Sequence, residues 1–346
     1  MTPFCRFSLP AAVILLAVSA LLSLAPAAPA DQALRVYFVD VEGGQATLFV
    51  TPEGESLLID TGWPGNSGRD ADRIAAAAKD AGISKIDHVL ITHYHDDHVG
   101  GAPQLSAKIP IGTFIDHGEN RESGAQKLYE AYKALLDSGK YKHIVAKPAE
   151  KLPIKGINVD VIAADGAVLD KPLPGAGQPN AACEDFHPPT DNTENPRSLG
   201  TLITFGQLKI LDLGDLTADK EKELMCPVNR IGHVDVYIAS HHGFFQSGSA
   251  CLVHAIAPRV AIVDNGEKKG GSPSALSIIK SSPSIEAMWQ LHYSLEAQAS
   301  NAAAEQLANL QGPDAGNYLE LAGKRDGSFE ISNSRTKESK AYSSRR

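Results

Sequence analysis

One stretch of ten residues limits what this chain can fold into more than any other: Thr-His-Tyr-His-Asp-Asp-His-Val-Gly-Gly at positions 92–101. Five side chains within six residues offer an imidazole nitrogen or a carboxylate oxygen, ligand atoms that suit a borderline ion such as Zn²⁺. The short apolar run at 88–91 predicts a strand that delivers them into a loop, and Gly100-Gly101 lets the backbone turn tightly afterwards. A solvated polar loop is the ordinary explanation for one histidine, but His-x-His-x-Asp-His after a strand predicts a metal site.

The first thirty residues have the pattern of a secretory signal. Arg6 supplies the positive charge, residues 11–24 form an apolar run, and Ala28-Pro29-Ala30 offers small residues for cleavage. The run is too short to predict a membrane span, and no later segment is apolar enough to cross a bilayer. We therefore expect residues 1–30 to be removed and the mature protein to be soluble and secreted or periplasmic.

Charge bears on the partners of the mature chain. The full chain has a formal net charge of −9, and loss of Arg6 with the signal makes it −10. An acidic chain does not resemble a protein that tracks a phosphate backbone by bulk electrostatics. This argues against long nucleic acid as substrate without excluding it, because a local basic patch could survive. A small molecule or a phosphoester is the expected substrate, and the sequence does not give the oligomeric state.

The cysteines suggest one disulfide. Cys5 lies in the signal, which leaves Cys183, Cys226 and Cys251 in an exported chain where a disulfide can form. We expect Cys183 to pair with Cys226, since both lie in irregular segments flanked by prolines. Cys251, followed by Leu and Val, is expected to be a small buried hydrophobic residue.

Alternation and helical periodicity predict a mixed chain of strands and helices. Residues 31–333 are expected to form one domain, with 164–197 as a long irregular loop that lines the cleft and 334–346 as a flexible basic tail. The pattern favours two sheets packed together with helices outside. Strands are expected at 34–41, 45–50, 56–60, 86–92, 111–116, 157–163, 199–205, 208–213, 234–239, 260–263, 285–291, 318–321 and 328–332, and helices at 69–81, 101–108, 123–137, 218–224, 251–256, 274–281 and 297–310.

Three more predicted strands end in side chains that can bind a metal: Asp60-Thr61-Gly62, Asp212-Leu213-Gly214-Asp215 and Ser240-His241-His242-Gly243. In this order they resemble the metallo-β-lactamase-fold hydrolases, and most of all the branch containing the extracellular domain of the competence protein ComEC. That branch is marked by an opening Asp-Val-x-x-Gly-Gln/Asp, here residues 40–46, and by a late His-His-Gly. The resemblance covers about residues 34–290. It implies an α/β (α+β) fold, a four-layer αββα sandwich of two mixed sheets with helices outside.

The resemblance also implies a role for each matching residue. His93 and His95 would hold a first ion, Asp97 and His98 a second, and Asp215 would bridge the two. His241 would complete the second site, although the sequence does not decide between it and His242. Asp60 would orient a ligand from behind, and Asp97 or Asp215 would accept a proton during catalysis. By strand alternation, Asp96 is expected to point away from the ions, and Tyr94 is expected to face the core or the cleft wall.

One departure from the family affects the first ion. Much of the fold has a third histidine about two dozen residues before the bridging aspartate, but here residues 191–195 read Asp-Asn-Thr-Glu-Asn. The competence branch shares this lack. Either water completes a weaker first site, or Asp191, Asn192 or the nearby His187 substitutes, so occupancy by one metal instead of two stays open.

Together these features predict an exported metallo-hydrolase that uses a metal-bound hydroxide and two divalent ions, with Zn²⁺ expected first and Mn or Fe as alternatives. The expected substrates are phosphoesters, as for a phosphodiesterase. A lactone or β-lactam hydrolase is the alternative chemistry, and a non-catalytic binding protein stabilised by metal is the alternative class.

Two further segments have open interpretations. Lys268-Lys269-Gly270-Gly271 before Ser272-Pro273 is either an anion pocket or a solvated loop that caps a helix. His292-Tyr293 follows a predicted strand, and we interpret the pair as a surface pair that could also reach the cleft.

Overall fold

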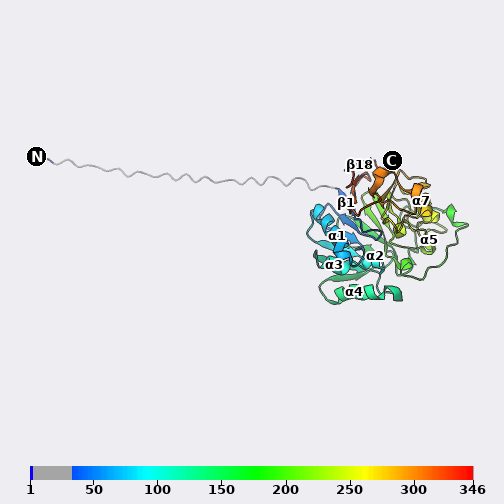
Figure 1. The fold of residues 1–346 in the computed structure, drawn as a ribbon, viewed down its shortest axis with the longest axis horizontal. Coiled ribbons are helices and arrows are strands. Elements are labelled where there is room, and N and C mark those ends of the chain that lie inside the picture. The colour runs from blue at the N-terminus through cyan, green and yellow to red at the C-terminus, as the bar shows by residue number, and fades with distance from the viewer. Residues whose placement is uncertain (3–32, 346) are drawn as a thin grey trace. The chain divides into compact units, whose positions relative to one another are not determined.

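The computed structural model describes residues 1–2 and 33–345 (Figure 1). The segment predicted to be a signal lies almost entirely outside the described residues, and Cys5 lies there too. Among the described residues, no helix is long and apolar enough to cross a membrane. The chain divides into Met1–Asp31 and Gln32–Arg346, and the second unit contains every other feature predicted above.

One mixed sheet of the second unit gathers the first and last strands of the chain. Its strand order is β18-β17-β16-β1-β2-β3-β4-β5-β6, and β3 to β6 run parallel. The central strands β2, β3 and β4 are short, mostly apolar runs because both of their faces are largely buried, whereas the edge strand β6 is mostly exposed. Their bounds are β1 Leu34–Phe38, β2 Thr47–Val50, β3 Ser56–Ile59, β4 Ile86–Leu90, β5 Ile111–Asp116, β6 Lys142–Val145, β16 Leu319–Gly323, β17 Phe329–Asn333 and β18 Ser339–Tyr342.

The second mixed sheet has the order β15-β14-β13-β12-β11-β10-β8-β7, with β9 paired to β8. Strands β11 to β15 are parallel, while β10 and β11 form an antiparallel hairpin. The bounds are β7 Lys151–Leu152, β8 Asn158–Ala164, β9 Ala167–Val168, β10 Gly200–Phe205, β11 Leu208–Asp212, β12 Val236–Ile238, β13 Val260–Val263, β14 Ala287–His292 and β15 Leu307–Asn309.

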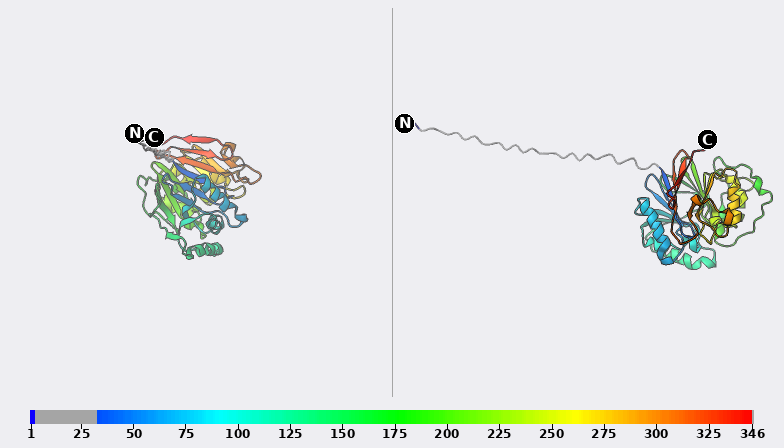
Figure 2. Two further views of the ribbon diagram at one scale, coloured as in Figure 1. Left: turned by 90° about the vertical axis from the view of Figure 1, so that its left-hand side faces the viewer. Right: turned by 45° about the horizontal axis from the view of Figure 1, so that its top comes forward.

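Helices cover the outer face of each sheet, as the right-hand view of Figure 2 shows with blue and cyan helices on one side and yellow ones on the other. One apolar cluster joins the inner faces of the two sheets, and two others join each sheet to its helices. This is the predicted αββα sandwich. The helices are α1 Arg69–Asp80, α2 Asp96–Val99, α3 Ala102–Ser106, α4 Gln126–Asp137, α5 Ala218–Met225, α6 Ala250–Ile256 and α7 Pro273–Lys280.

The helix predicted at 297–310 is wrong. This segment forms two short 3₁₀ turns, Gln298–Ser300 and Ala304–Gln306, and then β15. Its alanines have high helix propensity, but pairing with β14 fixes an extended path. Asn301 also donates to the Ser294 carbonyl and accepts a hydrogen bond from the Gln290 side-chain amide.

The flexible tail predicted at 334–346 is also wrong for the residues described there. Strand β18 pairs antiparallel with β17 and extends the first sheet. Tyr342 is buried, stacks on Phe329 and accepts a hydrogen bond from Trp289 Nε1 at 2.9 Å. Pairing with β17 and burial of Tyr342 therefore outweigh the polar, basic composition of the segment.

The predicted disulfide is confirmed. Cys183 and Cys226 are bonded, with their Cα atoms 5.7 Å apart, and Cys251 is free and buried. The bond ties the irregular segment 164–197 to the chain directly after α5.

Candidate metal centre

The four ligand-bearing segments meet because each follows the carboxyl end of a strand in a parallel run. Asp60 follows β3, the His93–His98 run follows β4, Asp215 follows β11, and the His241-His242 pair follows β12. Strands β3 and β4 are parallel neighbours in one sheet, and β11 and β12 are parallel neighbours in the other. In open α/β sheets, ligands bind outside such carboxyl ends.

Within residues 93–98 a single helical turn, α2, aims the side chains. Asp96 at its start is exposed, whereas Asp97 and His98 are buried. Asp96 thus points away as predicted, but the cause is this turn and not strand alternation. Tyr94 is also directed away, since its hydroxyl donates to the Gly118 carbonyl within a cluster of tyrosines.

One group of four buried side chains has its ligand atoms within 4.8 Å of one another: Asp97, His98, Asp215 and His242. His98 Nε2 lies 3.2 Å from Asp97 Oδ2 and 3.3 Å from Asp215 Oδ1. His242 Nε2 lies 3.0 Å from Asp97 Oδ2 and 3.5 Å from Asp215 Oδ1. We call this set the second-ion group. The resemblance implied His241 for this place, but the group contains His242 instead, because the turn at 241–242 directs the two rings to different oxygens of Asp215.

The other oxygen of Asp215 faces a different set, which we call the first-ion group: His93, His95, His241 and Asp215. His241 Nε2 lies 3.3 Å and His93 Nε2 3.9 Å from Asp215 Oδ2. His93 Nε2 lies 3.0 Å from His95 Nδ1. His241 therefore occupies the place of a third imidazole beside His93 and His95. The structure brings neither Asp191 nor His187 there, because Asp191 contacts Thr193 and the exposed His187 contacts Lys222.

Each of the five histidines directs one ring nitrogen into these groups and the other toward an outer partner. This arrangement fixes ring orientation in metal sites. The outer contact of His98 is the strongest, since its Nδ1 lies 2.7 Å from Asp60 Oδ2. Three others are His93 Nδ1 with Thr92 Oγ1 (3.1 Å), His95 Nε2 with Glu122 Oε2 (3.0 Å) and His241 Nδ1 with Ser247 Oγ (3.5 Å). His242 Nδ1 lies 3.4 Å from Asp264 Oδ1 without a hydrogen bond.

The backbone around the groups is strained. Asp60, His241 and His242 have φ of 60°, 55° and 55°, a left-handed conformation that costs a non-glycine residue about 1–3 kcal/mol. The strained turn directs the two adjacent imidazoles to different oxygens of Asp215. Gly44 lies so close to Asp97 that a Cβ there would collide with the Asp97 carbonyl, which explains the glycine of the opening motif.

Buried charge shows that the residues fit a cation. Burial disfavours a charged imidazole, yet the carboxylates of Asp215, Asp97 and Asp60 raise the pKa of His98 well above its usual value. Asp215 Oδ1 is buried and has no hydrogen-bond partner among the described residues, although it faces two imidazoles. An unpaired buried carboxylate oxygen is costly, and a divalent ion between these nitrogens and oxygens would satisfy it.

The loop after β13 was only partly foreseen. The Lys269 ammonium contacts Asp97 Oδ2 and lies 4.9 Å from the centre of the Trp63 ring. Gly271 donates its backbone N–H to the His242 carbonyl at 2.8 Å. Residues 268–270 also line a small cavity of about 140 Å³ beside His241 and His242. Lys269 thus lies beside the second-ion group, and nothing in the sequence indicates its contact with Trp63.

His292 corrects another prediction, because it is not part of a surface pair. It is buried at the end of β14, and its Nε2 lies 2.7 Å from Asp40 Oδ1 in the opening motif. Arg73 also pairs with Asp40 at 3.0 Å. This network positions the segment before Gln45, whose side chain donates to Asp212 at 2.5 Å.

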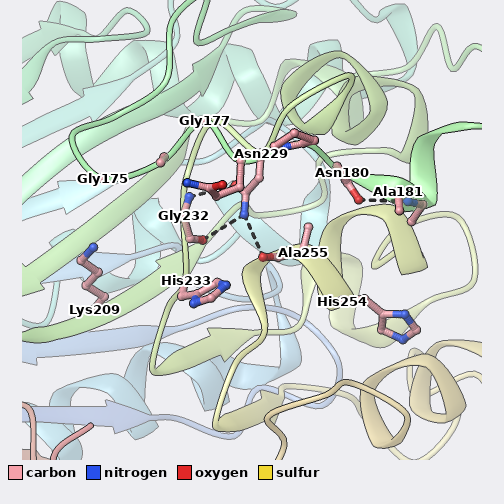
Figure 3. A pocket seen from close by; sticks show the side chains of 14 residues that line it. Gly175, Gly177, Asn180, Ala181, Lys209, Asn229, Gly232, His233, His254 and Ala255 are labelled. Carbon is pink, nitrogen blue, oxygen red and sulfur yellow. Dashed lines mark hydrogen bonds between the residues drawn. The ribbon is translucent and has the colours of Figure 1, made fainter. Parts of the chain in front are cut away.

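A larger cavity of about 550 Å³ lies away from both ion groups (Figure 3). Lys209, near the start of β11, borders it together with His233 and His254, whereas Asp215 follows the end of that strand. Asn229 closes one side by donating to the Ala255 carbonyl at 2.8 Å. The cavity contains none of the predicted ligands.

Glu221 on α5 holds the loop that follows the histidine pair, and its burial predicts how the free energy of unfolding depends on pH. Its carboxylate accepts hydrogen bonds from Gly248 N (2.7 Å) and Ser249 N (2.9 Å), and burial raises its pKa from 4.5 to about 6. A raised folded-state pKa means that stability is lost as the pH rises from about 4.5 through about 6. This loss, at most about 2 kcal/mol, should disappear in Glu221→Gln.

Urea unfolding of chelator-treated protein at pH 4.5, 5.5 and 6.5 measures this effect. The exposed neighbour Glu223 provides the matched control, since Glu223→Gln should keep the pH slope of the wild type. An identical slope in Glu221→Gln would contradict the assignment.

Part of the chain matches a known family. Residues 39–183 match the Metallo-beta-lactamase superfamily. The chain carries a metallo-β-lactamase domain. The match includes Asp60 and the His93–His98 run, whereas Asp215 and the histidine pair lie beyond it.

The chain is similar to two curated proteins and to one solved structure, among others. The chain is 24% identical to Recombination protein 2 of Haemophilus influenzae over 67% of its own length but only 24% of the relative's. It is 30% identical to a Hydroxyacylglutathione hydrolase of Stenotrophomonas maltophilia over 29% of this chain and 36% of that one. The metallo-beta-lactamase fold protein YhfI from Bacillus subtilis aligns with a TM-score of 0.45 and 13% identity, over 74% of this chain and 95% of that chain.

The chain thus spans about a quarter to a third of the length of these curated relatives. The metallo-β-lactamase domain and the relatives named as hydrolases support a metallo-hydrolase with candidate residues for divalent metal.

Proposed function

We propose that this protein is an exported, metal-dependent hydrolase of phosphoesters. The observation that carries the substrate class is the position of Lys269, whose ammonium group reaches Asp97 in the second-ion group. Two divalent ions against the innermost carboxylates, Asp97 and Asp215, already leave a net positive charge. A lysine added to this charge favours an anionic reacting group over a neutral one.

The chain's own residues would divide the work as follows. His93, His95 and His241 would hold one ion and Asp97, His98 and His242 the other, with one oxygen of Asp215 toward each. When bound, two such ions supply a nucleophile of hydroxide strength near neutral pH and Lewis acidity toward the oxygen that gains charge. Zn²⁺ suits this mixture of imidazole and carboxylate, and Mn or Fe are the alternatives.

The remaining steps are assigned to side chains around the two ion groups. Ser198 Oγ accepts a hydrogen bond from the backbone N–H of Asp215 at 3.1 Å and so fixes the bridging carboxylate. Lys269 leaves Asp97 to bind an oxygen of the phosphoryl group. The carboxylate of Asp97, freed from the ammonium group, accepts the proton lost by the attacking water.

Export is part of the proposal. It is supported by the signal pattern at residues 1–30 and by the disulfide between Cys183 and Cys226, because disulfides persist in oxidising compartments. Long nucleic acid is a less suitable substrate for a chain with this net negative charge.

Elemental analysis and hydrolysis of bis(p-nitrophenyl) phosphate test the proposal together. We expect up to two equivalents of Zn or Mn and turnover that a chelator removes. Lys269→Ala should raise KM for the phosphodiester about tenfold, since a hydrogen bond to a charged group contributes about 1.5–3 kcal/mol, without loss of bound metal. Lys140→Ala, on an exposed turn, is the control.

Neutral substrates separate the alternatives. A lactone or β-lactam hydrolase would turn over a neutral lactone or a chromogenic cephalosporin faster than the phosphodiester. A binding protein stabilised by metal would retain the ions and turn over none of these compounds. Either result would overturn the phosphoesterase proposal.

A further inference from the structure

A third cavity, of about 630 Å³, lies where the irregular segment 164–197 meets two loops of the candidate metal centre. Phe186, Pro188 and Pro189 line it from the irregular segment. Thr217 lines it two residues after Asp215, and Phe245 three residues after His242. Its size is in the range of small-molecule sites, about 300–1,000 Å³.

Ring contacts connect this cavity to the ion groups. The Phe244 ring centre lies 5.3 Å from that of His241 and 4.5 Å from that of Phe245. Phe244 also lines the small cavity beside His241 and His242, so adjacent phenylalanines border the two cavities. The Ala218 N–H donates to the Gln246 carbonyl at 3.1 Å, which holds together the loops that follow Asp215 and His242.

The chemistry of the cavity differs from that of the ion groups. Phe245 is 63% exposed, an unusual state for a large aromatic side chain in a folded unit. Of the described residues that line this cavity, none is a lysine or an arginine. Asp191 supplies the single carboxylate of the lining, and its Oδ1 accepts hydrogen bonds from the Thr193 backbone and hydroxyl. The cavity therefore suits an uncharged, flat group, with Asn192 and Gln246 offering amides at its edge.

We infer that this cavity binds the apolar, ring-bearing part of the substrate, and that Phe245 stacks on that ring while the phosphoryl group lies at Lys269 and the ion groups. The inference rests on the proposed phosphoesterase function. It assigns to Phe245 and the irregular segment the selection of substrates with an aromatic or heteroaromatic group over small alkyl esters.

Two binding measurements on the full, metal-loaded chain test this inference. The first is a fluorescence titration with 8-anilinonaphthalene-1-sulfonate, which reports on the cavity and needs no turnover. Phe245→Ser should weaken binding about tenfold, Phe245→Trp should restore it, and Leu310→Ser, at another exposed large apolar residue, should leave it unchanged. Equal affinity in the wild type and Phe245→Ser would overturn the inference.

The second measurement compares phenylphosphonate with methylphosphonate by calorimetry. In the wild type the phenyl compound should bind about tenfold more tightly, and in Phe245→Ser the two affinities should become nearly equal while that of methylphosphonate stays the same. An unchanged ratio would show that the cavity does not receive the substrate's ring.

The two measurements also distinguish failure of the inference from failure of the proposed function. If neither phosphonate binds the wild type, both the phosphoesterase proposal and the assignment of the cavity to its substrate fail, whatever the fluorescent probe does. If both phosphonates bind equally well and the probe ignores Phe245, the phosphoesterase proposal stands and the inference alone fails.

Discussion

Replacing Asp215 by alanine should lower kcat for bis(p-nitrophenyl) phosphate by about 10³-fold or more while the chain stays folded. Each oxygen of this carboxylate faces a different ion group, His98 Nε2 at 3.3 Å from Oδ1 and His241 Nε2 at 3.3 Å from Oδ2. Loss of one stabilising group in other active sites already costs 10²–10³-fold. Here a single substitution removes a ligand from both groups.

The measurement is a steady-state assay at saturating metal, with circular dichroism to verify the fold and elemental analysis to count ions. Asp326→Ala, in the exposed turn between β16 and β17, is the control and should retain full activity. If Asp215→Ala retained turnover within a few-fold of the wild type, the assignment of Asp215 as the bridging residue would be wrong. If it lost only thermal stability and the wild type had no turnover, the protein would be a binding protein.

Removal of metal should destabilise the wild type strongly. Asp97, Asp215 and Asp60 are buried beside five histidines, so without a cation the carboxylates depend on protonated imidazoles for compensation. A ligand present at a thousand times its Kd stabilises the folded state by about 4 kcal/mol. For a unit of this size, that corresponds to a fall in Tm of roughly 5–10 °C after the metal is removed.

The Tm is measured by thermal unfolding before dialysis against a chelator, after dialysis, and after Zn²⁺ or Mn²⁺ is added back. In Asp215→Ala the difference between loaded and stripped protein should shrink, because both groups have lost a ligand. The same Tm in loaded and stripped wild type would contradict binding of metal to these buried residues.

Much of the site could be predicted because its ligands follow a rule of local order. Side chains that end parallel strands meet at one edge of a sheet, and the runs at 57–62, 86–98, 208–215 and 234–243 each combine a short apolar strand with polar residues directly after it. The contact between Asp60 and His98 is also where the resemblance implied it.

The parts that could not be predicted depend on contacts between distant segments. The directions of His241 and His242 follow from left-handed φ angles that no periodicity reveals. His292 is buried because Asp40, 252 residues earlier in the chain, lies opposite it. The predictions of a helix at 297–310 and of a flexible tail after it fail for the same reason. Pairing with β14 and β17 overrides the local helix propensity of the first segment and the polar composition of the second.

The disulfide has a consequence for where this chain can work. It joins Cys183, three residues before Phe186, to Cys226 after α5. A covalent bond as well as packing therefore holds the wall of the cavity that Phe186 and Phe245 line. The sheets and both ion groups lie outside this closed loop, apart from Asp215 and the strands that lead to it. A chain made in a reducing cytosol would therefore keep its sandwich but loosen the wall beside Phe245. Host compartment and oxidant thus become practical variables for anyone who produces this protein to search for its substrate.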